Sequence, residues 1–177
     1  MPHSFAIKVI AACAVFSPVI SSFAHVTLEQ GSAAAGSYYK AVVKVPHGCE
    51  ASPTTAITVL LPEGVRSARP MPKAGWTLQP KVETLAVPYT SHGKTISSDV
   101  TQITWSGGKL PADFYDEFVF QAKLPEKPGP LWFKVLQTCE QGRNDWVQVP
   151  ASGTSTKDLK QPAALLEVKP SDHSSHH

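Results

Sequence analysis

Short apolar stretches separated by turn residues make up most of the chain after residue 24, and none has the period of about 3.6 residues that marks an amphipathic helix. In residues 114–124, Phe118, Phe120 and Ala122 alternate with polar neighbours, which predicts one buried face and one wet face. The whole pattern predicts about eight or nine short strands, drawn from residues 26–30, 37–45, 55–61, 76–82, 85–89, 100–105, 114–124, 131–139, 145–149 and 165–168.

The segments between these strands are rich in proline, glycine and polar residues. Residues 66–75 predict an irregular connection, residues 91–98 predict a mobile polar loop, and Gly107-Gly108 are expected to stop the strand before them. The chain has 16 prolines, which no long helix would tolerate. We therefore expect an all-β fold: a single β-sandwich with Greek-key connections, immunoglobulin-like or cupredoxin-like.

Length and charge narrow the class of protein. The chain has 177 residues, of which 42% are hydrophobic and 17% charged, and this suits one domain with one good core. The formal net charge is only +2, and no basic run is interleaved with aromatic residues. Nucleic acid is therefore not expected as a partner.

The N-terminal segment has the features of a secretory signal. Lys8 closes a short basic region, residues 9–20 form an apolar run, and the small residues Ser22 and Ala24 precede the expected cut. Residues 1–24 are thus predicted to be a cleaved signal peptide that sends the protein to the periplasm. The apolar run is too short to span a bilayer as a helix.

A rival interpretation treats residues 10–13 as a lipoprotein cleavage box, with a lipid anchor on Cys13. It would leave only about four apolar residues after Lys8, fewer than the usual ~7 to 15. Cleavage after residue 24 instead predicts a domain over residues 25–169 and a disordered, histidine-containing tail over residues 170–177.

Two cysteines, Cys49 and Cys139, would remain in the processed chain. In an oxidising compartment they predict a disulfide bond. The alternative is a copper or zinc site built on free thiolates, which would need further ligands nearby.

His25 becomes the first residue if the signal is removed after Ala24. Its α-amine and its imidazole could then chelate one metal ion in a small ring, and nitrogen donors in such an arrangement suit Cu(II). The alternatives are that cleavage falls elsewhere, or that His25 is an exposed terminus without a role.

The sequence resembles the YcnI-like copper-binding domain family over nearly all of residues 25–150. The motifs that carry the resemblance are His25-Val26-Thr27-Leu28, Val45-Pro46-His47-Gly48-Cys49-Glu50, Leu61-Pro62-Glu63-Gly64-Val65, Lys73-Ala74-Gly75-Trp76 and Gln137-Thr138-Cys139-Glu140-Gln141-Gly142 with Trp146. The resemblance implies a periplasmic or secreted β-sandwich that binds one Cu(II) ion through His25, Glu50 and Trp146. It also implies a partner among membrane copper transporters or other periplasmic copper proteins.

Several residues compete with this set of ligands. Glu29 is the rival of Glu50, and Trp132 is the rival of Trp146, although Trp132 lies in an apolar strand and is expected in the core. His47 would supply a second imidazole, but in the family's pattern it belongs to the loop motif and is not a ligand. His92 is expected to be a surface histidine. The tail histidines His173, His176 and His177 could gather metal weakly.

The sequence therefore predicts a non-enzymatic periplasmic Cu(II)-binding protein that serves copper trafficking or homeostasis. One alternative is a copper-dependent polysaccharide monooxygenase, which would need a second histidine ligand and a flat aromatic face. Another is a blue-copper carrier with a free cysteine thiolate and Met71 as axial ligand. A third is a purely structural sandwich that binds no metal.

Overall fold

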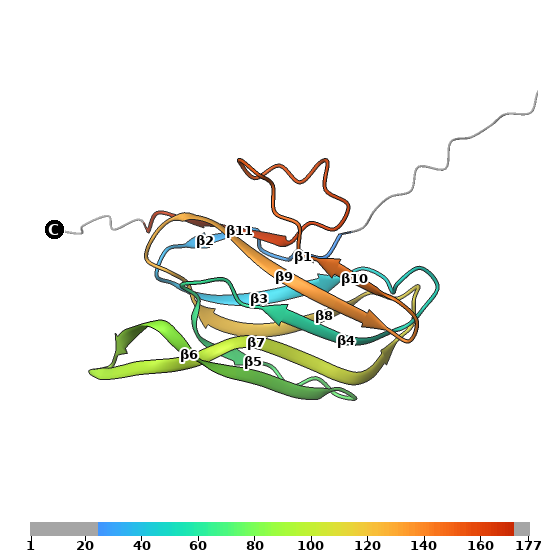
Figure 1. Ribbon diagram of the computed structural model, residues 1–177, viewed down its shortest axis with the longest axis horizontal. Helices are drawn as coiled ribbons and strands as arrows, with labels where there is room; N and C mark the ends of the chain where they lie inside the picture. Colours follow the sequence, from blue (N-terminus) through green and yellow to red (C-terminus); the bar gives the residue numbers. More distant parts are fainter. Residues whose placement is uncertain (1–24, 172–177) are drawn as a thin grey trace, which may run out of the picture.

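The computed structural model describes residues 25–171, and every regular element in that range is a β-strand (Figure 1). The strands form two sheets, ordered β1-β3-β8-β5 and β2-β11-β9-β4-β7-β6, and β10 pairs with β9 beside the second path. Their bounds are β1 Thr27–Leu28, β2 Ser32–Ala34, β3 Tyr38–Val45, β4 Thr54–Leu60, β5 Arg66–Pro70, β6 Thr77–Ser91, β7 Lys94–Leu110, β8 Asp116–Lys123, β9 Gly129–Cys139, β10 Arg143–Trp146 and β11 Ala164–Lys169.

The core lies between the two sheets and is filled by their inward-facing side chains. Phe118 and Phe120 of β8 meet Trp105 of β7 and Phe133 of β9, with ring centroids 5.6 and 6.0 Å apart in the two pairs. All four rings are almost completely buried. The two packed sheets thus confirm the all-β sandwich that the alternation of apolar and polar residues predicted.

Two expected connections are more ordered than predicted. Residues 66–70 form β5, which pairs with β8 at the edge of its sheet. Pro70 is accommodated because an edge strand has one side that needs no ladder hydrogen bond. The polar residues 91–98 are not a loop: β6 and β7 continue up to a two-residue turn in which His92 and Gly93 have φ of 46° and 73°.

Gly107-Gly108 do not stop the strand either, because β7 runs on to Leu110. The indole of Trp76 lies flat against Gly108, and a Cβ built there would be 2.1 Å from Trp76 Cε2. The glycine therefore makes room for an aromatic ring inside a continuous strand. The short strand β2 was not predicted at all.

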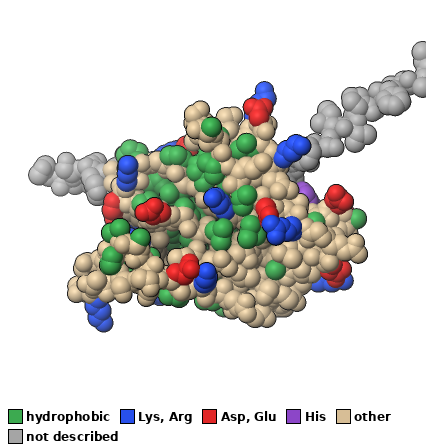
Figure 2. Space-filling model, in the orientation of Figure 1, with side chains coloured by type: hydrophobic (Ala, Val, Ile, Leu, Met, Phe, Trp, Pro, Cys, Tyr) green, Lys and Arg blue, Asp and Glu red, His purple; other side chains and the backbone are tan. Residues whose placement is uncertain are grey.

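The face of the molecule shown in Figure 2 carries no single dominant charge. Figure 2 shows that acidic and basic side chains are scattered over the visible face and do not gather in one patch. Within residues 25–171, no helix is long and apolar enough to cross a membrane. The predicted signal peptide and the tail histidines lie outside the described residues.

Candidate functional site

His25 lies at the end of the short β1–β3 pair. In this pair Thr27 is opposite Lys44 and Leu28 is opposite Val43. Because the pair is antiparallel, His25 lies at the same end as the loop that joins β3 to β4. The His25 ring is half-buried, and its centroid is 5.9 Å from that of Trp146 at an angle of 57°.

Trp146 is the last residue of β10 and lies opposite Val135 of β9. Only 4% of its surface is exposed, so the indole is part of the packed interior. Its Nε1–H donates a hydrogen bond to Gln137 Oε1 at 3.0 Å. Because the polar edge of the indole is occupied, the ring meets His25 as an aromatic surface. The structure thus brings together two of the three predicted site residues.

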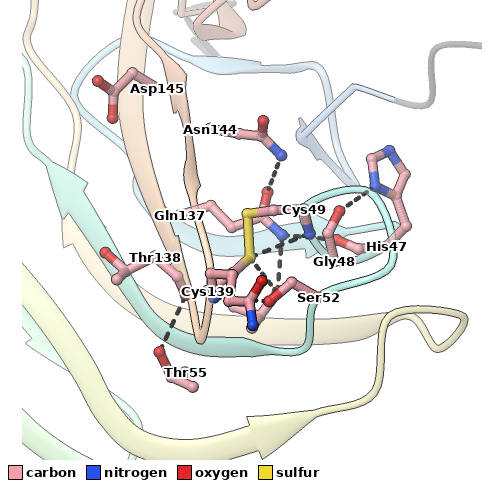
Figure 3. The surroundings of a disulfide bond; sticks show 12 residues. His47, Gly48, Cys49, Ser52, Thr55, Gln137, Thr138, Cys139, Asn144 and Asp145 are labelled. Atoms are coloured by element: carbon pink, nitrogen blue, oxygen red, sulfur yellow. Dashed lines mark hydrogen bonds between the residues drawn. A yellow bond between two sulfur atoms is a disulfide. The ribbon is translucent and has the colours of Figure 1, made fainter.

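Gln137 connects the parts of this corner, and sequence analysis did not single it out. Its Nε2 donates to the His47 carbonyl oxygen at 2.6 Å and to Thr54 Oγ1 at 2.9 Å, and its Oε1 also accepts from Asn144 Nδ2 at 3.3 Å (Figure 3). The side chain is completely buried. The available signal was a polar residue at an inward-facing position of an apolar strand.

The predicted disulfide between Cys49 and Cys139 is confirmed. The two Cα atoms are 6.0 Å apart, and the bond joins the β3–β4 loop to the end of β9. Cys49 N–H also donates to Cys139 Sγ at 3.1 Å. The blue-copper alternative is therefore wrong, because neither sulfur is a free thiolate. The same finding removes the thiolate metal site.

Glu50 occupies a tight turn beside the disulfide. Cys49 and Ser52 exchange backbone hydrogen bonds of 3.0 and 2.9 Å, and Glu50 has φ of 54° at the first position between them. Its exposed side chain borders a hollow together with Glu140, which pairs with Lys109. Among the described residues, Glu50 forms no hydrogen bond or ion pair with His25, so its role as a ligand stays a prediction.

His47 lies in the same loop as Glu50, between β3 and β4. Its ring centroid is 6.5 Å from that of Trp146, at 70°. Its Nδ1 donates a hydrogen bond to the Gly48 carbonyl oxygen at 2.6 Å, since a carbonyl oxygen can only accept. Over residues 25–171, no three His, Cys, Asp or Glu side chains gather as a ready metal cluster.

The remaining candidates lie away from this corner or play structural roles. Trp132 is not in the core as expected: it is half-buried, because the odd-numbered residues of β9 point inward and Trp132 faces the other way. Trp105 is a core residue, and its Nε1 donates to the Met71 carbonyl oxygen at 3.0 Å. Glu29 N–H donates to the Val42 carbonyl oxygen at 3.0 Å, just past β1.

The fold and the disulfide-linked corner define an all-β protein made of two packed sheets with an immunoglobulin-like fold. An uncharacterized protein from Nocardia farcinica shares this fold: it is 29% identical, the match covers 81% of this chain and 97% of that chain, and the TM-score is 0.61. The chain belongs to the DUF1775 family, a domain of unknown function, whose model matches residues 25–168.

A second solved structure is more distant. It is a protein from Corynebacterium diphtheriae named as membrane anchored, with 9% identity, coverage of 84% of this chain and 35% of that chain, and a TM-score of 0.38. No curated protein matches this chain.

Proposed function

We propose that this protein binds one Cu(II) ion outside the cytoplasm and serves copper trafficking or homeostasis without catalysing a reaction. The observation that carries the proposal is the contact between His25 and the buried indole of Trp146, 5.9 Å apart at one end of the sandwich. Cleavage after Ala24 would give His25 a free α-amine beside its imidazole. Two nitrogen donors on one residue suit Cu(II).

The residues at this corner fit such an ion. His25 supplies nitrogen, and Glu50 in the neighbouring loop supplies a hard anionic oxygen, as the family resemblance implies. Trp146 has no good lone pair to donate, because the indole nitrogen carries a proton that already binds Gln137. Its ring instead shields the ion and offers an aromatic surface to a cation.

The disulfide supports a site outside the cytoplasm. Disulfide bonds persist in oxidising compartments and are rare in the cytosol, and Cys49–Cys139 holds the Glu50 loop against the strand that leads to Trp146. Periplasmic localisation, and a copper transporter or another periplasmic copper protein as partner, are parts of the proposal. They follow from the signal sequence and the resemblance.

The test compares Cu(II) binding by two proteins that differ only at the N-terminus. One begins at His25, and the other carries one additional alanine before His25, which removes the free amine from the histidine. Isothermal titration should show tight one-to-one binding for the first protein and a large loss of affinity for the second. Equal affinities in the two proteins would show that the terminal amine is not a ligand.

A copper-dependent monooxygenase is the second candidate, and one observation favours it. The side chains of Phe114 and Tyr115 are 62% and 58% exposed, in the loop whose Ala112 carbonyl oxygen accepts a hydrogen bond from Gly48 N–H at 2.9 Å. Exposed aromatics therefore lie beside the His47 loop. Copper-loaded protein incubated with chitin or cellulose and a reductant would release oxidised sugars if this function were present, and we expect none.

A further inference from the structure

We propose that His47 is a further metal-binding residue, so that the α-amine and imidazole of His25 and the imidazole of His47 would together hold the Cu(II) ion beside Trp146. This inference rests on the proposed function and deepens it. It replaces a site with one histidine by a site with two.

The backbone brings the two histidines to the same place. β1 pairs antiparallel with β3, with Thr27 opposite Lys44; His25 precedes β1 by two residues and His47 follows the end of β3 by two. His47 follows Pro46 immediately, at the bend where β3 ends. The two histidines thus lie at the same end of this strand pair, although 22 positions separate them in the sequence.

Both imidazoles contact the same aromatic ring. The centroids of His25 and His47 lie 5.9 and 6.5 Å from that of Trp146, and each ring is tilted or edge-on to the indole. Trp146 is almost entirely buried and therefore fixed in place. Both imidazoles therefore border one fixed indole.

The hydrogen bond between the His47 ring and the backbone suits a metal ligand. Nδ1 donates to the Gly48 carbonyl oxygen at 2.6 Å, so Nε2 is the ring nitrogen through which His47 would bind a metal ion. Metal-binding histidines commonly donate their second ring N–H to a carbonyl in this way, and the bond orients the ring. The Gly48 backbone passes close to its neighbours, since a Cβ there would lie 2.2 Å from the Ser52 carbonyl oxygen.

One buried amide fixes the position of the whole group. Gln137 donates to the His47 carbonyl oxygen and accepts from Trp146 Nε1, at 2.6 and 3.0 Å. The relative position of loop and indole is therefore set before any metal binds. Glu50, by contrast, lies at an exposed turn that borders a hollow with Glu140 and Gln141. Nitrogen from His47 thus has stronger geometric support than oxygen from Glu50.

The experiment counts imidazoles on Cu(II) in the processed protein that begins at His25. Electron spin echo envelope modulation of the wild type should show two equatorial imidazoles, and His47→Gln should show one. The affinity of His47→Gln for Cu(II) should fall by more than the roughly 10- to 100-fold that loss of an outer partner costs. The loss should also exceed that in Glu50→Gln.

The matched control is His92→Gln, because His92 is exposed in the β6–β7 turn. Removal of its imidazole should change neither the number of imidazoles bound to Cu(II) nor the affinity for Cu(II). One imidazole in the wild type would overturn the inference while leaving the proposed function intact. No one-to-one binding by the wild type would overturn both. Since the echo measurement on the wild type needs no variant, it decides the question even if His47→Gln does not fold.

Discussion

At the scale of single residues, Gln137 determines how the corner is built. A buried amide has two donors and two acceptor sites, and Gln137 uses them on His47, Thr54, Trp146 and Asn144. No buried side-chain nitrogen or oxygen among the described residues lacks a partner. Since buried polar groups are costly when unpaired, the loss of this one side chain disturbs several others.

We predict that Gln137→Met lowers the free energy of unfolding by about 3 kcal/mol, because each buried group left without a partner costs about 1 to 3 kcal/mol. Trp146 Nε1 and the His47 carbonyl oxygen would lose this partner, together with Thr54 Oγ1 and Asn144 Nδ2. Urea denaturation measures the change. Gln121→Met is the control, since the Gln121 side chain is exposed and its replacement should cost less than about 0.5 kcal/mol. Equal losses would contradict the role of Gln137.

Tyr39 provides a pH-dependent prediction. Burial, with a smaller effect from Glu29, raises the pKa of Tyr39 from 10.0 to about 12. The unfolded chain therefore releases this proton at lower pH than the folded protein. The contribution of Tyr39 to the free energy of unfolding is therefore fully present below pH 10, and it should be lost as the pH rises from about 10 towards 12.

Denaturation at a series of alkaline pH values would measure that loss, and Tyr39→Phe should flatten the decline. Tyr38→Phe is the control, because Tyr38 is 64% exposed on the same strand. The hydroxyl of Tyr39 donates to the Gln30 carbonyl oxygen at 2.6 Å, so Tyr39→Phe should also be less stable at neutral pH by about 1 kcal/mol. An unchanged alkaline profile in Tyr39→Phe would rule out this residue as the source.

At the scale of elements, the loop between β3 and β4 carries most of the candidate chemistry. It contains His47, Cys49 and Glu50, and it is attached to the rest of the sandwich by the disulfide and by Gln137. Gly48 lets its backbone pass close to neighbouring segments. Its N–H donates to the Ala112 carbonyl oxygen, and a Cβ would lie 2.9 Å from Ala112 Cα.

We predict that Gly48→Ala destabilises the protein by about 1 to 3 kcal/mol, because an added methyl group in a packed site forces the backbone to shift. It should also weaken Cu(II) binding, since His47 would move with the loop. Thermal denaturation and metal titration measure the two effects. Gly31→Ala is the control, because a Cβ at Gly31 would meet no atom within 4 Å. A fully stable Gly48→Ala variant would show that the loop can adjust.

At the scale of the whole molecule, the candidate site lies where the two sheets meet at one end. His25 precedes a strand of the smaller sheet, whereas Trp146 belongs to the strand that pairs with β9 of the larger one. An ion held between them would join the two sheets. Binding to the folded state alone stabilises that state by mass action.

We predict that Cu(II) at about a hundredfold excess over its Kd stabilises the processed protein by about 2.7 kcal/mol. The melting temperature should then rise by about 5 to 10 °C, as expected for a domain of this size. Differential scanning calorimetry with and without Cu(II) measures the shift. Protein with one alanine before His25 should show a much smaller rise, and an equal rise would place the ion elsewhere.

The strands and the disulfide could be predicted because their signals are local or few in number. Alternation along β8 indicates a half-buried strand without knowledge of its partners, and two cysteines in an oxidising compartment allow one intramolecular pairing. The β6–β7 turn and the continuation of β7 through Gly108 were missed. The turn depends on the pairing of β6 with β7, and Gly108 makes room for the ring of Trp76. No local sequence pattern reveals either contact.

The sequence by itself determined the all-β class and the pairing of Cys49 with Cys139, and it marked His25 as a candidate metal ligand. These conclusions rest on alternation, composition and position relative to a predicted signal peptide, which are all properties of the linear chain. Only the tertiary structure decided which other side chains meet His25. Pairing of β1 with β3 and of β10 with β9 places His47, Trp146 and Gln137 at one corner. These contacts depend on strand register across sequence separations that a linear pattern does not encode.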